Sequence, residues 1–181
     1  MSDKLSKLSK SETEKIKKDY KYYMKEYLSY VIVIIVVLAM KKFVITPIRV
    51  NGDSMMKTLH DGDIMILNII GYKKDGLKRF DIAVCDEGHE YIIKRVIGLP
   101  GEKIQYKDNK LYVNGKLVKD NYGLDETDDF TVEVPKDSYF VLGDNRKNSA
   151  DSRFFGPFKK SKILGKTKLT IFPFSRFGNK K

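Results

Sequence analysis

The chain has 181 residues, enough for one domain with a core of its own and a short additional segment. Its net charge of +11 arises from 35 basic and 24 acidic residues, which are interspersed along the chain. This distribution indicates affinity for anionic surfaces rather than a groove for nucleic acid. The sequence contains no RNA-recognition, zinc-finger or helix-turn-helix pattern, so we expect no nucleic-acid partner.

Cysteine use excludes an intramolecular disulfide, because Cys85 is the only cysteine. It lies in the apolar run RFDIAVC, and we expect it to be a small core residue. A chain without disulfides fits the cytosol as well as an extracytoplasmic protein whose core needs no cross-link. The histidines His60 and His89 are isolated in the sequence, so neither a metal nor another cofactor is implied.

The N-terminal region divides into a polar and an apolar part. Residues 1–26 contain eight lysines, and we expect them to be disordered or weakly helical. The following LSYVIVIIVVLAM, residues 28–40, carries no charge but is shorter than the ~20 residues that a membrane span needs. Apolar character resumes in FVITPI behind Lys41 and Lys42, whose charged ends can extend to a headgroup layer.

We predict a transmembrane helix over residues 27–46. Tyrosines stand where an interfacial aromatic belt is expected, at Tyr22, Tyr23, Tyr27 and Tyr30. A cleaved signal peptide is the alternative, but AMKKFVITP lacks a small-x-small cleavage pattern and the preceding polar segment is long. A buried core helix is disfavoured, because β-branched residues would occur on all of its faces.

The distribution of basic residues sets the expected orientation. Eight lysines precede the span, whereas only Lys41, Lys42 and Arg49 follow it closely. Positively charged flanks stay in the cytoplasm, so we expect a single-pass protein with a cytoplasmic N-terminus. Residues 47–181 would then lie outside the cytoplasmic membrane of a bacterium.

Beyond the span, short alternating apolar runs separated by turn sequences such as HDGD, LPGE and PKDS predict a mainly β, antiparallel domain. Asn114-Gly115 is typical of a two-residue hairpin turn. The more polar stretch of about 102–136 is expected to form a smaller inserted β subdomain. We expect strands in residues 43–50, 63–70, 79–85, 90–97, 103–107, 110–113, 116–118, 130–134, 138–144 and 166–172.

The stretch VNGDSMMKTLHDGD, residues 50–63, places Ser54 in a turn with Lys57 three residues later. A serine and a lysine can act as nucleophile and base, and S-x-x-K is a signature of class A β-lactamases and penicillin-binding proteins. Their companion motifs S-D-N and K-T-G do not occur in the chain. Gly52 and the following HDG also leave little room for a helical turn that would bring Ser54 and Lys57 together. Lys57 is therefore disfavoured as the base.

The run EYIIKRVI, residues 90–97, offers a second lysine. In strand periodicity Lys94 emerges between Ile92 and Val96, while Arg95 points to the other face. Apolar neighbours withhold water from the ammonium and lower its pKa, which a lysine base requires. Arginine stays protonated and cannot take this role. A lysine that extends from the strand into solvent is the alternative.

Three motifs carry a family resemblance: GDSMMKTL with the GD of residues 62–63, KRVIGLPGE at residues 94–102, and GDNRKNSADSR at residues 143–153. The last of these, by itself, is either a charged surface loop or a fixed polar network behind the strand SYFVL. Together with the anchor, the three motifs resemble those of bacterial type I signal peptidases, membrane-anchored serine proteases with a Ser/Lys dyad. The resemblance runs from the anchor to near the C-terminus.

The resemblance implies an endopeptidase that removes signal peptides from exported preproteins at the outer face of the cytoplasmic membrane. Its partners would be signal peptide-bearing preproteins, bound as extended strands and cleaved after small residues, and the lipid bilayer. Ser54 matches the nucleophile and Lys94 the general base, acting through an acyl-enzyme. Ser149 matches the serine that hydrogen-bonds and orients the lysine, and Met55 a residue of the substrate pocket. Supporting roles fall to Asp144, Asn145, Arg146, Asp151 and Arg153.

Two positions depart from the family's pattern. Lys57 stands where the family usually has proline, which fixes φ as lysine does not. Gly52 stands where some members have a serine hydroxyl that donates to the oxyanion. The oxyanion hole of this chain is therefore expected to rest on backbone N–H groups, notably that of Ser54.

The sequence allows three other interpretations of the function. A related self-cleaving repressor with a Ser/Lys dyad would need a DNA-binding domain where this chain has residues 28–40, which argues against it. A membrane-tethered β module without activity is favoured only by Lys57. A signal peptidase dedicated to a narrow substrate set such as pilins stays open. The aromatic tail IFPFSRF, residues 171–177, either touches lipid or is buried, and the oligomeric state is not indicated.

Overall fold

The computed structural model describes residues 2–43 and 46–180, and within the N-terminal helix the side chains of residues 14, 15, 18 and 20–38. The chain forms two compact units, residues 1–42 and 43–181. The expected roles of Lys41 and Lys42, and the last residues of the expected span, lie outside the described side chains. The boundaries expected at residues 26 and 46 stay predictions.

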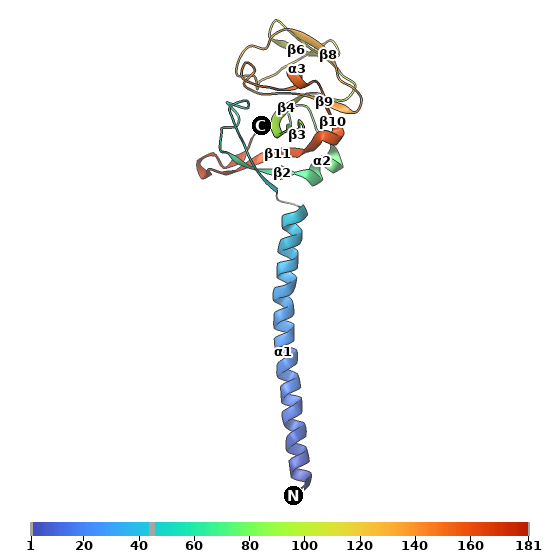
Figure 1. Cartoon of the computed structure of the whole chain (residues 1–181), viewed down its shortest axis with the longest axis vertical. Helices are drawn as coiled ribbons and strands as arrows, with labels where there is room; N and C mark the ends of the chain where they lie inside the picture. The colour runs from blue at the N-terminus through green and yellow to red at the C-terminus, as the bar shows by residue number, and fades with distance from the viewer. Residues whose placement is uncertain (1, 44–45, 181) are drawn as a thin grey trace. The chain divides into compact units, whose positions relative to one another are not determined.

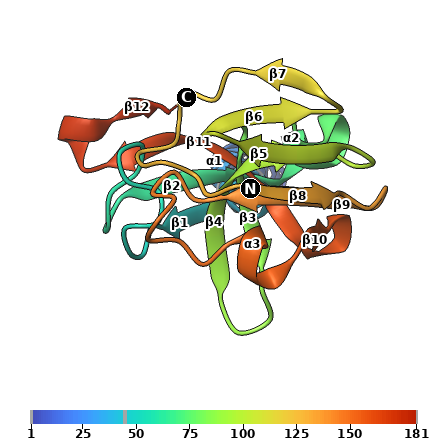
Figure 2. The ribbon, with the colours of Figure 1, turned by 90° about the horizontal axis from the view of Figure 1, so that it is seen from above.

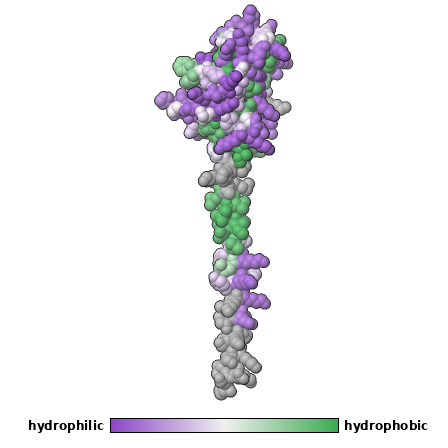
Figure 3. All heavy atoms as spheres, turned by 90° about the vertical axis from the view of Figure 1, so that its right-hand side faces the viewer, coloured by the Kyte–Doolittle hydropathy of each residue, from purple (hydrophilic) through white to green (hydrophobic). Residues whose placement is uncertain are grey.

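The N-terminal unit is one long α-helix, α1 (Ser2–Phe43). The expectation that residues 1–26 are disordered or weakly helical is wrong, since the helix begins at Ser2 and continues through them. Lysine, glutamate and leucine are good helix formers, and Glu14 stands one turn before Lys18, a favourable spacing. Figure 3 shows apolar side chains gathered in one band of this helix. Among the described residues, no helix reaches the length and hydropathy of a membrane-crossing segment.

The second unit is built on an antiparallel sheet with the strand order β1-β2-β11-β3-β4-β9-β10, and β12 pairs with β11 (Figures 1 and 2). Its central strands carry runs of buried aliphatic residues, as expected where both faces of a sheet are covered. The strands are β1 (Thr46–Arg49), β2 (Ile64–Asn68), β3 (Ile82–Asp86), β4 (Tyr91–Gly98), β9 (Ser138–Leu142), β10 (Phe158–Lys159), β11 (Ile163–Phe172) and β12 (Gly178–Asn179).

A smaller antiparallel sheet has the order β7-β6-β5-β8 and lies at the end of this unit opposite β2 and β11 (Figure 1). Its strands are β5 (Lys103–Lys107), β6 (Lys110–Val113), β7 (Lys116–Val118) and β8 (Phe130–Glu133). The predicted mainly β, antiparallel fold with a smaller second sheet is confirmed. The hairpin predicted at Asn114-Gly115 joins β6 to β7, and both residues have positive φ, +50° and +77°.

Short helices were not predicted from the sequence. Residues Ile69 and Ile70 were expected to end a strand, but they begin α2 (Ile69–Asp75), because the Asn68 side chain accepts the Gly71 N–H and caps a helix there. The others are α3 (Ser152–Phe155) and the 3-10 turns η1 (Lys160–Lys162) and η2 (Phe174–Arg176). In the tail, Phe172, Phe174 and Phe177 are exposed, so of the two alternatives for these side chains burial in the core is not observed.

Strand β4 separates different parts of the core. Ile92 and Val96 pack in one apolar cluster together with Cys85, whose predicted core position is confirmed. Ile93 packs in a second cluster with Met55 and Leu59, and Ile97 in a third, beneath the small sheet. The alternation predicted for residues 92–97 is therefore confirmed, and it sends Lys94 to the face of Ile92 and Val96.

Candidate active site

Ser54 lies in a turn that follows β1 and is closed by backbone hydrogen bonds. Val50 N–H donates to the Asp63 carbonyl at 2.8 Å, and Gly62 N–H donates to the Val50 carbonyl at 2.9 Å. Gly52 has φ of +79°, a conformation that favours glycine, and its N–H donates to Asp61 Oδ1. One residue after Ser54, the Met55 side chain is buried in the core and holds the turn against the sheet.

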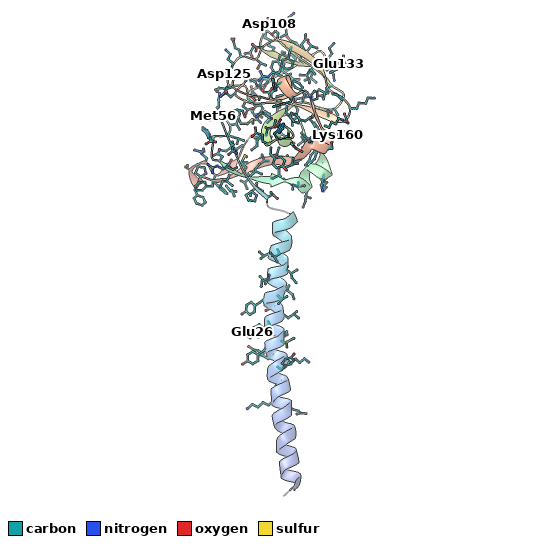
Figure 4. All side chains as sticks on the ribbon, in the orientation of Figure 1. Glu26, Met56, Asp108, Asp125, Glu133 and Lys160 are labelled. Carbon is teal, nitrogen blue, oxygen red and sulfur yellow. The ribbon has the colours of Figure 1, made fainter. Side chains whose placement is uncertain are left out.

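The lysine that contacts Ser54 is Lys94. Its Nζ donates to Ser54 Oγ at 2.7 Å, and only 4% of the residue is exposed. Lys57 is exposed to solvent at the surface of the same turn. Figure 4 labels its neighbour Met56, which marks the place of the turn on the second unit. The disfavoured S-x-x-K pairing is therefore not formed, and the lysine of β4 meets the serine.

Burial lowers the pKa of Lys94 below its usual value, because the charged amine loses water. The carboxylates of Asp151 and Glu90 act in the opposite direction and raise this pKa. The Asp151 carboxylate also accepts hydrogen bonds from Arg153 and from Gly143 N–H. Its negative charge is therefore not dedicated to the protonated amine of Lys94. Burial therefore makes the neutral amine easier to form than in water, and a neutral amine can accept a proton from a hydroxyl.

The loop of residues 143–151 braces the Ser54 turn from the side of β9. Asn145 N–H donates to the Ser54 carbonyl at 3.0 Å, and Asn145 Nδ2 donates to the Asp53 carbonyl at 3.2 Å. Gly143 makes this close approach possible, since a Cβ there would lie 2.5 Å from the Ser54 carbonyl oxygen and 2.2 Å from Ser149 Oγ. Residues 92 positions apart in sequence are thus held in direct contact.

Ser149 does not form the hydrogen bond to Lys94 that its resemblance implied. Its Oγ is buried beside Gly143 and has no hydrogen-bond partner among the described residues. Its role in orienting Lys94 stays a prediction.

Asp151 organises the end of the loop. Its carboxylate accepts the Gly143 N–H at 3.0 Å and two bonds from the Arg153 guanidinium at 2.9 and 2.8 Å. It also caps α3 by accepting the Arg153 N–H. Arg153 in turn donates to the Arg146 carbonyl at 2.6 Å, which ties the loop to itself. Asp151 is fully buried and its bond to Gly143 N–H forms away from water, whereas Arg153 is partly exposed.

Asp144 forms a fully buried ion pair with Arg95. The guanidinium donates from Nε and Nη2 to the two carboxylate oxygens at 2.7 and 2.6 Å. Thr58 Oγ1, four residues after Ser54, donates to Asp144 Oδ2 at 2.5 Å. The ion pair therefore joins three parts of the site: the strand that carries Lys94, the loop that braces Ser54, and the turn that contains Ser54.

Arg146 extends from the loop toward the small sheet. Its guanidinium donates to the Tyr106 hydroxyl at 2.8 Å, to Thr127 Oγ1 at 2.9 Å and to Asp120 Oδ2 at 2.6 Å. Sequence reasoning identified Asp144 and Arg146 but missed Thr58, Arg95, Tyr106, Asp120 and Thr127 as their partners. A usable signal existed for one of these partners: an arginine within an apolar strand, such as Arg95, requires a buried carboxylate.

A cleft of about 210 Å³ opens beside the dyad. Its walls are two extended segments, residues 49–51 and 90–94, and both Ser54 and Lys94 line it. Strand β9 pairs with β4 from Arg95 onward, so within the described residues no strand occupies this edge of β4 at residues 91–94. Apolar side chains from Met55, Ile92, Ile93 and Phe155 complete the lining.

Comparisons with known proteins identify a family for this chain. A family described as signal peptidase, peptidase S26, matches residues 23–172. Signal peptidase IB of Staphylococcus aureus (strain Mu50) is 41% identical over 158 residues, which cover 75% of this chain and 82% of that protein. Signal peptidase I of Bacillus amyloliquefaciens is 42% identical over 149 residues, covering 75% of this chain and 80% of that protein.

Among solved structures, a crystal structure of a signal peptidase I from Enterococcus faecalis is similar. It is 37% identical, covers 50% of this chain and 95% of its own, and superposes with a TM-score of 0.46.

Proposed function

The chain belongs to the bacterial type I signal peptidases of peptidase family S26 and removes signal peptides as a serine endopeptidase, and we propose that Ser54 is its nucleophile and Lys94 its general base. The observation that carries the proposal is the 2.7 Å contact between Lys94 Nζ and Ser54 Oγ, made by an almost fully buried amine. Burial supplies the neutral base, and the contact distance suits direct proton transfer.

In the proposed reaction, neutral Lys94 takes the hydroxyl proton as Ser54 Oγ attacks the scissile carbonyl of the preprotein. The lysine then returns this proton to the departing amine, and the mature protein leaves. The signal peptide stays bound to Ser54 as an ester. Lys94 next takes a proton from water as the water oxygen attacks the ester, and it returns this proton to Ser54 Oγ as the bond between Oγ and the acyl carbon breaks. The signal peptide leaves as a carboxylic acid that ionises in solution, and Ser54 and neutral Lys94 are restored.

The negative charge on the attacked carbonyl oxygen needs donors. We assign the Ser54 backbone N–H to this task, with Gly52 beside it supplying no hydroxyl. Asn145 supports this arrangement because its Nδ2 donates to the Asp53 carbonyl at 3.2 Å, and this carbonyl lies in the same peptide plane as the Ser54 N–H. Asp144, Asp151 and Arg153 would act indirectly, by holding the loop that carries Asn145. Arg146 belongs to the same group.

The preprotein would bind in the cleft as an extended strand. Its backbone would pair with the unoccupied edge of β4 at residues 91–94, opposite the extended residues 49–51. Met55 and Ile93 would line shallow apolar pockets, which suit the small side chains before the cleavage site.

The family is membrane-associated, and we propose that α1 provides the anchor of this chain. The support is the uncharged run of residues 28–38, whose exposed aliphatic side chains lack an apolar environment within their own unit. Tyr22, Tyr23, Tyr27 and Tyr30 are also exposed and would lie at the headgroup level. The lysine-rich N-terminus would be cytoplasmic and residues 47–181 extracytoplasmic.

Cleavage of a secretory preprotein by the purified full-length protein in detergent tests the catalytic assignment. We expect wild type and Lys57→Ala to release the signal peptide, and Ser54→Ala and Lys94→Ala to be inactive. Cleavage by Ser54→Ala would refute the nucleophile, and loss of cleavage in Lys57→Ala alone would transfer the base to Lys57. A folded wild type that cleaves no preprotein would favour the inactive tethered module.

A further inference from the structure

The connection between β7 and β8 crosses the catalytic loop. We call residues 120–127 of this connection the clamp. The clamp contains no strand or helix, yet it contacts Arg95, Asp144 and Arg146, the three charged residues that surround the base of the loop. Figure 4 shows Asp125 of the clamp and Met56 of the catalytic turn on the same side of the second unit.

The first contact is a buried network around Arg146. Asp120 accepts a bond from Arg146 Nη2 at 2.6 Å, and Tyr106 of β5 donates its hydroxyl to the same carboxylate oxygen. Thr127 accepts a further bond from Arg146 at the other end of the clamp. Burial alone would raise the pKa of Asp120, but the charge of Arg146 and the hydrogen bonds outweigh it and lower this pKa. The carboxylate is therefore ionised at neutral pH, and the network keeps Arg146 in one position.

The second contact covers Arg95. The Tyr122 ring lies over its guanidinium, with Cζ 3.7 Å from the ring centroid, and also packs against Phe80 at 5.1 Å. The carbonyl of Phe80 accepts a bond from Arg95 Nη1 at 2.9 Å. Such cation–π stacking is stronger when the cation is withdrawn from water, and Arg95 is fully buried.

The third contact joins the two backbones. Leu124 N–H donates to the Asp144 carbonyl at 2.7 Å. Next to it, Gly123 lies so close to Arg146 that a Cβ would be 3.3 Å from the guanidinium carbon. The clamp is thus fitted to the loop on both sides of Asn145, the residue that holds the Ser54 carbonyl.

We propose that the clamp positions the catalytic loop, with Asp120 and Tyr122 as its positioning residues. This inference rests on the proposed roles of Ser54 and Lys94. Asp120 and Tyr122 fix Arg146 and Arg95, these arginines hold residues 144–146, and Asn145 holds Ser54 against Lys94. The small sheet therefore contributes to catalysis although neither positioning residue lines the cleft beside the dyad.

In this arrangement the clamp affects the turnover rate, kcat, and not the binding of the preprotein. Displacement of Asn145 would move Ser54 relative to Lys94, and misplacement of reacting groups by ~1 Å can cost about 100-fold in rate. Among the described residues, neither Asp120 nor Tyr122 lines the cleft formed by residues 49–51 and 90–94. We therefore expect kcat to change and KM to stay nearly constant.

The test measures kcat and KM for preprotein cleavage by the full-length protein, together with the thermal midpoint of each variant. We expect Asp120→Asn and Tyr122→Leu to lower kcat by about 10- to 100-fold with KM within about twofold of wild type. Tyr122→Phe keeps the ring over Arg95 and should restore kcat. Glu126→Gln, an exposed change in the same segment, should match wild type.

Val113→Ala serves as the control for simple destabilisation, because Val113 is a buried core residue of the small sheet outside residues 120–127. A loss of kcat in Val113→Ala equal to that of Tyr122→Leu at the same thermal midpoint would overturn the inference. Unchanged kcat in Asp120→Asn and Tyr122→Leu would also overturn it. Ser54→Ala, measured in parallel, separates the two proposals. Continued activity of Ser54→Ala would refute the role of Ser54 as nucleophile. An inactive Ser54→Ala together with fully active clamp variants would refute only the positioning role of the clamp.

Discussion

Lys94 and Arg95 are consecutive residues of β4, and both are almost completely buried, with exposed fractions of 4% and 0%. Their surroundings differ in the way that their chemistry requires. Arg95 is held by the Asp144 carboxylate, the Phe80 carbonyl and the Tyr122 ring. Lys94 contacts the neutral Ser54 hydroxyl on the opposite side of the strand.

One strand thus carries a structural cation and, one residue earlier, the amine that we propose as the base. A buried guanidinium remains charged and must be paired, so Arg95 fixes the charged framework of the site. A buried amine without a dedicated carboxylate becomes a weaker base and loses its proton more easily. Because successive side chains of β4 point to opposite faces of the sheet, these two environments stay apart although Lys94 and Arg95 are adjacent in sequence.

Removal of Lys94 should have the largest effect on activity. Lys94→Met should reduce cleavage by about 10²- to 10⁴-fold, the range associated with a positioned general base. Folding lowers the pKa of Lys94 from 10.5. Between the pKa of the folded state and that of the unfolded state, the unfolded state binds more protons, so stability rises with pH. The cost of burying the charged amine is fully present below this window, and Lys94→Met removes it. We therefore expect an inactive protein with a higher thermal midpoint at neutral pH, a gain that fades as the pH rises through 10.5; a lower midpoint would contradict this account.

Removal of Arg95 should have the opposite effect on stability. Arg95→Met leaves Asp144 buried without its partner, and breaking a buried ion pair in this way costs about 3–5 kcal/mol. Urea denaturation of Arg95→Met beside Lys103→Met, which changes an exposed residue of β5, measures this loss. Equal stability of the two variants would show that the charged framework is not needed.

The space around Lys94 offers a finer test. Ala83 of β3 is paired with Lys94 across the sheet and is fully buried on the same face. Ala83→Val would add two methyl groups beside the lysine stem, at a cost of about 1–3 kcal/mol for overpacking, and should displace Nζ from Ser54. We expect kcat to fall further than in Val141→Ile, which enlarges a side chain of the same cluster that is paired with Val96 rather than with Lys94. Equal kcat in the two variants would show that Ala83 has no special relation to the base.

Several parts of the fold and site follow from local patterns. The alternation in EYIIKRVI predicted the apolar neighbours of Lys94, because the side-chain period of a strand is fixed by its backbone. Asn114-Gly115 predicted a hairpin since both residues tolerate positive φ. The small sheet was predicted from the polar, turn-rich composition of about 102–136. In each case the information lies within a few neighbouring residues.

Other parts depend on contacts between distant residues. Arg95 and Asp144 are 49 positions apart, and Asp120 and Arg146 are 26 apart, so no local period relates them. Ser149 illustrates the converse, because its motif implied a bond to Lys94 while its Oγ lies beside Gly143 without a partner. α2 formed in place of the end of a strand because one side chain, Asn68, caps it. These polar contacts between distant residues could therefore be identified only in the structure.

The pH dependence of cleavage by wild type and Glu90→Gln tests the central claim, that Lys94 acts as a neutral base, most directly. Activity requires deprotonated Lys94, so the rate should rise with pH through a midpoint below 10.5, the usual pKa of lysine. The negative charge of Glu90 raises the pKa of Lys94, and its removal should move this midpoint to lower pH. Glu126→Gln, which removes an exposed carboxylate of the clamp, should leave the midpoint in place. A midpoint at or above 10.5 in wild type, or an unchanged midpoint in Glu90→Gln, would contradict the account.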